Sequence, residues 1–130
     1  MRLARKKSAT LTEAELRLME ILWERGPSTV GDVVEALPED LPLAYSTVLT
    51  TLRIMDDKNY VRHTKEGRAF IYHPAVDRVE ARRSAVRQLL SRFFSDSPGL
   101  LVLNVLEQET IDAVELRQLK KMIDDSATEA

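Results

Sequence analysis

Four polar side chains in the stretch LAYSTVLTTLRIM, residues 43–55, are spaced so that one helix would present them together. Ser46, Thr50 and Arg53 follow one another at i, i+4 and i+7, with Thr47 beside them on the same side of a helix. Hydroxyl groups donate and accept hydrogen bonds, the threonine methyl suits the thymine methyl, and arginine pairs with guanine. This set of side chains could recognise base edges in a DNA major groove.

The same stretch lacks acidic residues. No Asp or Glu occurs between Leu41 and Met55, although the whole chain has 21 of them. An acid on this face would be repelled by the phosphates that flank a groove, so its absence fits DNA recognition. Taken alone, the hydroxyl-rich face is equally compatible with an ordinary solvated helix.

A second segment, residues 58–73, is basic, with four cations and the single acid Glu66. Its alternating residues predict strands over Tyr60–Thr64 and Ala69–His73, joined by the turn Lys65-Glu66-Gly67-Arg68. We expect a hairpin with a basic tip. The residues expected to contact the DNA backbone are Tyr45, Arg62, Lys65 and Arg68. His63 and His73 are expected to be structural or phosphate-facing.

Three predicted helices precede this hairpin. Thr12 and Glu15 fit a capping box, which opens a helix that ends before Gly26-Pro27. Ser28 or Thr29 begins a short second helix through about Leu37, and the third helix spans about residues 44–58. Three helices followed by a hairpin are typical of a winged helix-turn-helix.

Apolar spacing predicts the core face of the third helix, formed by Ala44, Val48, Leu52 and Met55. The aromatic residues Trp23 and Tyr45 are expected to be core residues rather than platforms for stacked bases.

Residues 75–130 are predicted to form a second set of helices, separate from the winged helix-turn-helix. Ser97-Pro98-Gly99 interrupts them, Leu100–Leu106 is expected to be a buried short helix, and Asp112 is expected to cap the last helix. Helices this short rarely form a stable core alone, so they are expected to pair with a second copy. The expected dimerisation residues are Val86, Leu90, Phe93, Leu100, Leu101, Leu103, Leu116, Leu119 and Ile123.

The predicted fold is therefore mostly α (α+β): a winged helix-turn-helix with a two- to three-stranded wing, followed by a helical dimerisation domain. The expected boundaries are a basic N-terminal arm at 1–10, the winged-helix DNA-binding domain at 11–74, and the dimerisation domain at 75–130.

The composition excludes several classes of function. The 130 residues include no cysteine and two histidines, which argues against disulfides, thiolate chemistry and a histidine-rich metal site. The sequence contains neither a set of residues typical of a catalytic site nor a glycine-rich phosphate loop. We therefore expect no enzyme activity, no cofactor and no small-molecule ligand. The absence of a long apolar run predicts a cytoplasmic protein.

The chain resembles the penicillinase and methicillin-resistance repressor family of BlaI/MecI type. The resemblance spans about Leu11 to Asp125 and is carried by AYSTVLTTLRIMDDKNYV, KEGRAFIYHP and the tail LLVLNVLEQETIDAVELRQLKKMI. It implies a homodimeric repressor on a palindromic operator, with the third helix reading DNA through Ser46, Thr47, Thr50 and Arg53.

The resemblance also implies how repression ends. In the best-known members a membrane sensor protease, responding to β-lactam or other cell-wall antibiotics, triggers cleavage after an asparagine. The matching position is Asn104, followed here by Val105 where those members have phenylalanine. The alternative function is a winged-helix protein-interaction module without specific DNA binding, which a salt series of duplex binding would distinguish.

Overall fold

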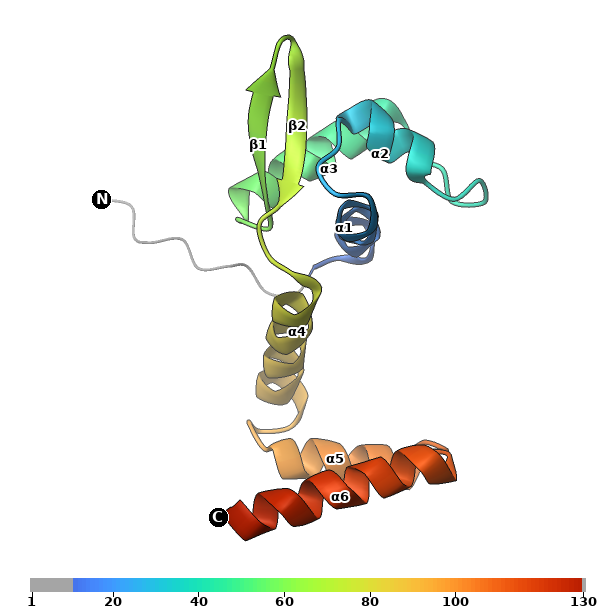
Figure 1. The fold of residues 1–130 in the computed structure, drawn as a ribbon, viewed down its shortest axis with the longest axis vertical. Coiled ribbons are helices and arrows are strands. Elements are labelled where there is room, and N and C mark those ends of the chain that lie inside the picture. Colours follow the sequence, from blue (N-terminus) through green and yellow to red (C-terminus); the bar gives the residue numbers. More distant parts are fainter. Residues whose placement is uncertain (1–10, 130) are drawn as a thin grey trace, which may run out of the picture. The chain divides into compact units, whose positions relative to one another are not determined.

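The computed structural model describes residues 11–129, so the predicted basic arm at 1–10 lies outside the described residues. Two compact units are present, with the division after Gln88. The elements, coloured along the chain in Figure 1, are α1 (Glu13–Arg25), α2 (Val30–Ala36), α3 (Tyr45–Asp57), β1 (Val61–Glu66), β2 (Ala69–Pro74), α4 (Arg78–Phe93), α5 (Pro98–Gln108) and α6 (Ala113–Glu129). The predicted mostly α fold with a small sheet is confirmed.

The two ends of α1 form as their residues predict. The Thr12 hydroxyl accepts a hydrogen bond from the Glu15 N–H at 3.2 Å, and the Thr12 N–H donates to the Glu15 carboxylate at 2.9 Å. Gly26 then ends the helix with φ of +85°, a conformation that glycine adopts without strain, while its N–H donates to the Leu22 carbonyl.

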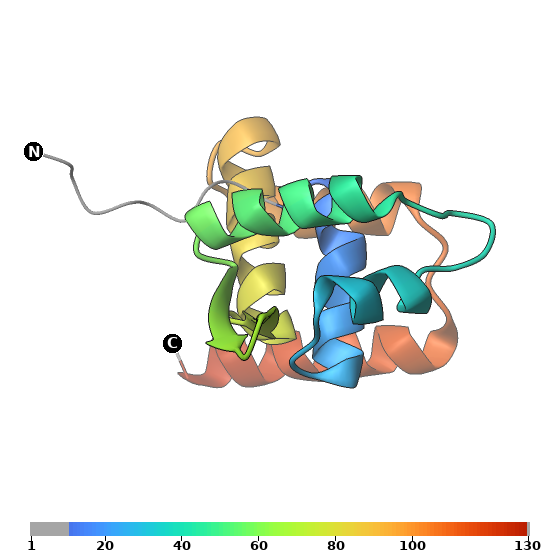
Figure 2. The same ribbon diagram turned by 90° about the horizontal axis from the view of Figure 1, so that it is seen from above.

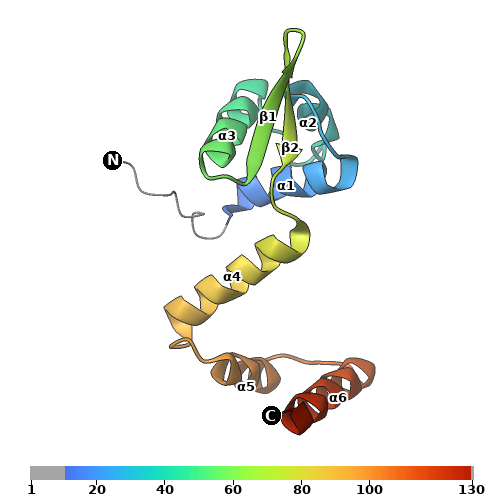
Figure 3. The same cartoon turned by 60° about the vertical axis from the view of Figure 1, so that its left-hand side comes forward.

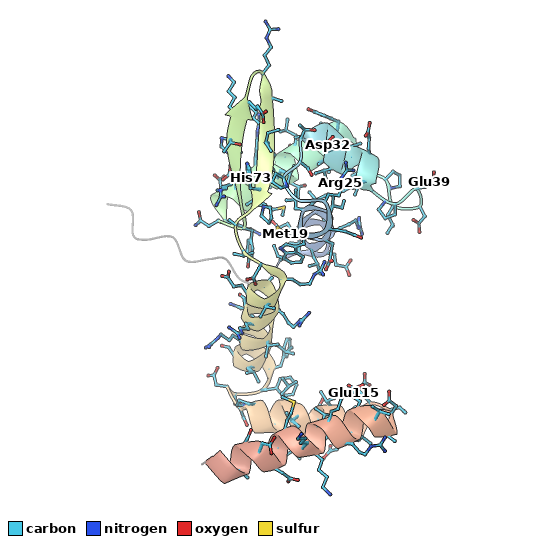
Figure 4. The ribbon with its side chains drawn as sticks, viewed as in Figure 1. Met19, Arg25, Asp32, Glu39, His73 and Glu115 are labelled. Carbon is cyan, nitrogen blue, oxygen red and sulfur yellow. The ribbon has the colours of Figure 1, made fainter. Side chains whose placement is uncertain are left out.

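A second capping box decides where α2 begins. The Thr29 hydroxyl accepts from the Asp32 N–H, and the Thr29 N–H donates to the Asp32 carboxylate, both at 3.0 Å. Hydrogen bonds from Thr29 hold the pKa of Asp32 below its ordinary value. Arg25 joins the helices by donating to the Asp32 carbonyl, and these two residues lie close together in Figure 4.

The core of the first unit lies between the three helices and the hairpin. Figure 2 shows α3 running across α1, and Figure 3 shows the hairpin standing between α3 and α2. On α3 the predicted core residues Val48, Leu52 and Met55 are fully buried. The buried apolar residues are Leu18, Met19, Ile21, Leu22, Val30, Val33, Leu37, Val48, Leu52, Met55, Tyr60, Val61, Tyr72 and Val76.

Two core predictions near the start of α3 are wrong. Ala44 is exposed as the N-cap residue, and Tyr45 is 56% exposed, because Leu43 is the side chain that packs against the core at this end of the helix. Trp23 is half-buried against the core, and its indole N–H donates to the Val76 carbonyl at 2.9 Å.

The hairpin is longer and its loop shorter than predicted. Glu66 pairs with Ala69, so the strands enclose the two-residue loop Gly67-Arg68, and Gly67 has φ of +62°. Tyr72 also exchanges both backbone hydrogen bonds with Ser28, at 2.8 and 3.0 Å. This bridge supplies the short third partner that the predicted two- to three-stranded wing allowed.

In the second unit, Pro98 begins a helix instead of separating helices. The Ser97 hydroxyl accepts from the Leu100 N–H at 3.1 Å and caps α5, since proline is well suited to a first helical turn. Asp112 caps α6 as predicted, accepting from the Glu115 N–H at 2.8 Å.

The predicted burial of Leu100–Leu106 is wrong for a single chain, because α5 and α6 together cannot enclose both of their apolar faces. No residue of α5 is buried. Within residues 11–129, no helix is long and apolar enough to cross a membrane.

Candidate nucleic-acid interface

The predicted base-reading residues share one exposed face of α3. Ser46, Thr47, Thr50 and Arg53 are all exposed, and Ile54 beside them is 45% exposed. Because Val48, Leu52 and Met55 anchor the opposite face in the core, the polar face is fixed in orientation toward solvent. The acid-free length of the helix ends at Asp56 and Asp57.

Thr51 does not belong to this face. Its hydroxyl donates at 2.7 Å to the carbonyl of Thr47 within the same helix, a common arrangement for threonine in a helix. No side chain caps the N-terminus of α3, where Tyr45 is exposed as the first residue. The partial positive charge of that helix end therefore lies beside the polar face.

The hairpin separates its cations between two faces. Residues paired across antiparallel strands share a face, so Lys65 lies with Phe70 on the face that also carries His63 and Tyr72. The Lys65 ammonium is 5.9 Å from the centre of the Phe70 ring. Arg62 lies on the other face, and Arg68 lies in the loop at the tip.

The two histidines also lie on opposite faces of the hairpin. The His73 ring is 2.9 Å from the Thr64 hydroxyl on the face that carries Arg62. Figure 4 labels His73 on the strand pair. His63 lies on the face toward α3, where its Nδ1 contacts the carboxylate of Asp56.

Asp56 and His63 belong to a cleft of about 300 Å³ between α3 and the hairpin, which we call the helix–wing cleft. Its lining residues are Arg53, Asp56, Asp57, His63, Phe70 and Tyr72. Burial and the Asp56 carboxylate raise the pKa of Tyr72, and the Arg53 guanidinium opposes this rise. Arg53 therefore lies near the hydroxyl of Tyr72, a buried residue whose backbone is paired with that of Ser28.

Sequence reasoning did not identify Asp56 as part of the site. The available signal was the strand alternation, which places His63 and Tyr72 on one face, together with the position of Asp56 one turn after Arg53. That Asp56 reaches His63 depends on the packing of the hairpin against α3, which no local pattern specifies.

Lys58 was grouped with the basic segment by sequence, but the structure places its charge inside the fold. Its ammonium binds both carboxylate oxygens of Glu15, at 3.0 and 2.8 Å, and ties the C-terminus of α3 to the start of α1. Burial acts to raise the pKa of Glu15, yet hydrogen bonds from Lys58 and Thr12 outweigh it and the pKa is lowered.

The expected dimerisation residues lie on three helices, with Val86, Leu90 and Phe93 on α4. Six of the nine are exposed by 41–68%: Val86, Phe93, Leu100, Leu103, Leu116 and Ile123. The remaining three, Leu90, Leu101 and Leu119, are half-buried. Asn104 and Val105 are exposed on α5. Among the described residues, no group of His, Cys, Asp and Glu side chains could hold a metal ion.

Known proteins resemble the chain over most of its length. Its sequence is 27% identical over 120 residues to the penicillinase repressor of Bacillus licheniformis, covering 92% of this chain and 94% of that protein. The transcriptional regulator BlaI of Mycobacterium tuberculosis is 40% identical over 75 residues, covering 57% and 54% of the two chains. The solution structure of the DNA-binding domain of the repressor BlaI has a TM-score of 0.50 at 30% identity, covering 56% of this chain and 89% of that one.

These similarities agree with the winged-helix architecture and with the resemblance noted in the sequence. The model of the penicillinase repressor family matches residues 11–125, which include every described helix and strand except the last turn of α6. The chain belongs to the penicillinase repressor family.

Proposed function

We propose that this chain is a sequence-specific transcriptional repressor that binds a palindromic DNA operator as a homodimer. The observation that carries the proposal is the exposed, acid-free face of α3, with Ser46, Thr50 and Arg53 in line. Membership of the family supports the same function, and so do two similar proteins, a penicillinase repressor and a transcriptional regulator.

In this proposal α3 enters the major groove and its polar face meets the base edges. An α-helix fits the width of that groove, where each base pair presents its own pattern of donors and acceptors. Arg53 is the cation of this face and is proposed to bind guanine, while Ser46, Thr47 and Thr50 contact neighbouring bases.

The hairpin and the start of α3 are proposed to bind the DNA backbone. Lys65 and Arg68 lie at and beside the hairpin tip, and Tyr45 is exposed at the uncapped helix end. Contacts of this kind fix the position of the protein on DNA without specifying sequence. Arg62 lies on the face away from Lys65, so we propose that it reaches a different stretch of backbone.

A second copy is proposed to cover the exposed apolar residues of α4, α5 and α6. Leu103, Phe93 and Ile123 are 58, 68 and 55% exposed, and large exposed apolar patches usually mark an interface. A twofold dimer would present two α3 helices to half-sites about one helical turn apart or a multiple of it, hence the palindrome.

We further propose that repression ends by cleavage between Asn104 and Val105, after a membrane sensor detects a cell-wall antibiotic. The bond lies in the middle of α5, so this helix must open before a protease can act. Cleavage there would divide the proposed dimer surface, and a monomer loses the affinity gained by binding two half-sites at once. The test follows the length of the protein in induced cells, with a variant substituted at Asn104 and Val105 for comparison. If the wild-type protein stays full-length while its target genes switch on, cleavage does not end repression.

The proposed function is tested by letting the full chain select duplexes from a random pool and then measuring its affinity for the selected duplex over a salt series. Specific DNA binding predicts one enriched sequence and an affinity that falls steeply with salt, because cations released from DNA drive the binding. A winged helix used as a protein-interaction module predicts no enrichment.

A further inference from the structure

In the helix–wing cleft, Asp56 of α3 and His63 of β1 are in direct side-chain contact. The His63 Nδ1 contacts the Asp56 carboxylate, and the two side chains are 47% and 27% exposed. They come from different elements, yet both border the opening that Arg53 also lines. The contact therefore connects the proposed base-reading helix with the proposed backbone-binding hairpin.

The rest of the cleft holds the His63 ring in place. The ring packs edge-on against Phe70 with centroids 5.3 Å apart, and lies 6.0 Å from the ring of Tyr72. Tyr72 is itself fixed by its burial and its backbone bridge to Ser28. Two aromatic neighbours and one carboxylate thus determine the orientation of the imidazole, which is unusual constraint for a partly exposed side chain.

Charges around His63 come from both neighbouring elements. On α3 these are Asp56, Asp57 and Arg53, and on the hairpin face the nearest cation is Lys65, while β2 contributes the Tyr72 hydroxyl. Asp56 is the carboxylate in contact with the imidazole, so it is the group whose charge a proton on His63 would neutralise.

We propose that Asp56 and His63 are positioning residues for DNA binding: together they fix the hairpin relative to α3, and protonated His63 cancels the charge of Asp56 at the DNA-facing cleft. This inference rests on the proposed function. Neither residue needs to touch a base or a phosphate for it to hold.

The physical reason is the location of Asp56, three residues after Arg53 and at the edge of the acid-free face. A carboxylate there repels the phosphates of a bound duplex unless a cation pairs with it. Histidine is the side chain whose charge changes near neutral pH. Protonation forms the ion pair and favours binding, whereas loss of the proton leaves Asp56 negative and the hairpin less firmly attached to α3.

The experiment is a pH series of affinity for the duplex that the full chain selects from a random pool. The wild-type Kd should rise roughly three- to tenfold between about pH 5.5 and 8. His63→Gln should remove most of this rise. Asp56→Asn should reduce it, because the ion pair that fixes the hairpin is lost while the charge of His63 itself remains. His73→Gln is the matched control, because His73 lies on the other face of the same strands with Thr64 and should leave the rise intact.

Asp56→Asn separates positioning from direct contact. If His63 bound a phosphate itself, its protonation would strengthen binding in Asp56→Asn as much as in the wild-type chain, and the rise would persist undiminished; that result overturns the proposal. A rise that persists in His63→Gln also overturns it. Because Asn cannot repel phosphates, we expect Asp56→Asn to bind at pH 8 at least as tightly as the wild-type chain.

Two controls separate this inference from the proposed function. Thermal unfolding of each variant shows whether it is folded, and the partial exposure of both side chains predicts little change. If the wild-type chain selects no sequence at all, the proposed function fails. If it selects one but its pH dependence is undiminished in Asp56→Asn, the proposed function stands and this inference alone is wrong.

Discussion

At the residue scale, Arg53 lies on the exposed polar face of α3, which we propose faces the bases, and a buried residue of the hairpin lies near it. Its guanidinium opposes the rise in the pKa of the buried Tyr72, and we propose that this neighbour restrains the arginine side chain. A restrained arginine loses less conformational freedom on binding, so it is well suited to recognise one base rather than many.

Arg53→Ala should weaken binding to the selected duplex by about 1–3 kcal/mol and relax the preference at a subset of base pairs. The loss follows from the paired hydrogen bonds that arginine makes with guanine. Competition assays with every single-base variant of the selected duplex measure it. An equal loss of affinity for all of these duplexes would identify Arg53 as a phosphate contact.

The cations at the hairpin tip should affect the salt dependence of binding, whereas Arg53 should affect sequence preference. Replacing Lys65 and Arg68 with alanine should reduce the salt slope by roughly 2 for each half-site and leave sequence preference unchanged, because each phosphate contact releases about one cation. The control is the double variant Lys120→Ala with Lys121→Ala, which removes the same number of charges from α6. It should preserve the salt slope. An unchanged slope in the tip variant would exclude these residues from the interface.

Residue exposure was predictable from sequence where helical spacing alone decides it. The polar face of α3 is such a case, since Val48 and Leu52 fix its opposite side. Tyr45 and Lys58 were misjudged because their positions depend on neighbours far along the chain or outside the helix: Leu43 packs where Tyr45 was expected, and Glu15 binds Lys58.

At the element scale, the orientation of α3 depends on its attachment to α1. The Glu15–Lys58 ion pair joins the start of one helix to the end of the other, and Glu15 is 4% exposed. The Thr12 capping box holds the same carboxylate, so one side chain serves both the helix start and the contact between helices.

Glu15→Gln should lower the free energy of unfolding by roughly 1–3 kcal/mol at neutral pH, since Lys58 loses its partner. The pKa of Glu15 is lowered in the folded chain, so its contribution is fully present above the unfolded pKa and is lost as pH falls through the lower folded value. The difference between wild type and variant should therefore shrink below about pH 4.3. Urea unfolding at several pH values measures this, and a difference independent of pH would show that the carboxylate charge is not stabilising.

The order and type of elements were predictable because their boundaries are encoded locally. Thr12 and Thr29 cap helices, and Gly67 permits a tight hairpin loop. The loop length was not predictable, since two- and four-residue turns fit the same letters and the strand register decides between them. The helix–wing cleft was also beyond the sequence, because it forms between elements.

At the scale of the whole molecule, the second unit exposes large apolar side chains on all of its helices, among them Phe93, Leu103 and Ile123. A groove of about 190 Å³ between α5 and α6 is lined almost entirely by aliphatic side chains. The sequence predicted that these positions are apolar. Their exposure in one chain became evident from the structure, because burial depends on the surrounding helices and on any second copy.

Leu103→Glu should convert a full-length dimer into a monomer, raising the dimer Kd roughly 100-fold or more, since a buried leucine contributes about 1.5–3 kcal/mol and an unpaired carboxylate adds a further cost. Sedimentation at micromolar concentration measures the assembly state. Gln118→Glu adds the same charge at an exposed polar position of α6 and should stay dimeric. A monomeric wild-type chain would refute the dimer.

We propose above all that the exposed face of α3 specifies the DNA sequence. The most direct measurement is selection from a random duplex pool by the wild-type chain and, in parallel, by a folded variant with alanine at positions 46, 50 and 53. We predict that the wild-type chain enriches one twofold-symmetric sequence and that the variant enriches none. Enrichment of the same sequence by both proteins, to the same degree, would show that this face of α3 does not specify the sequence.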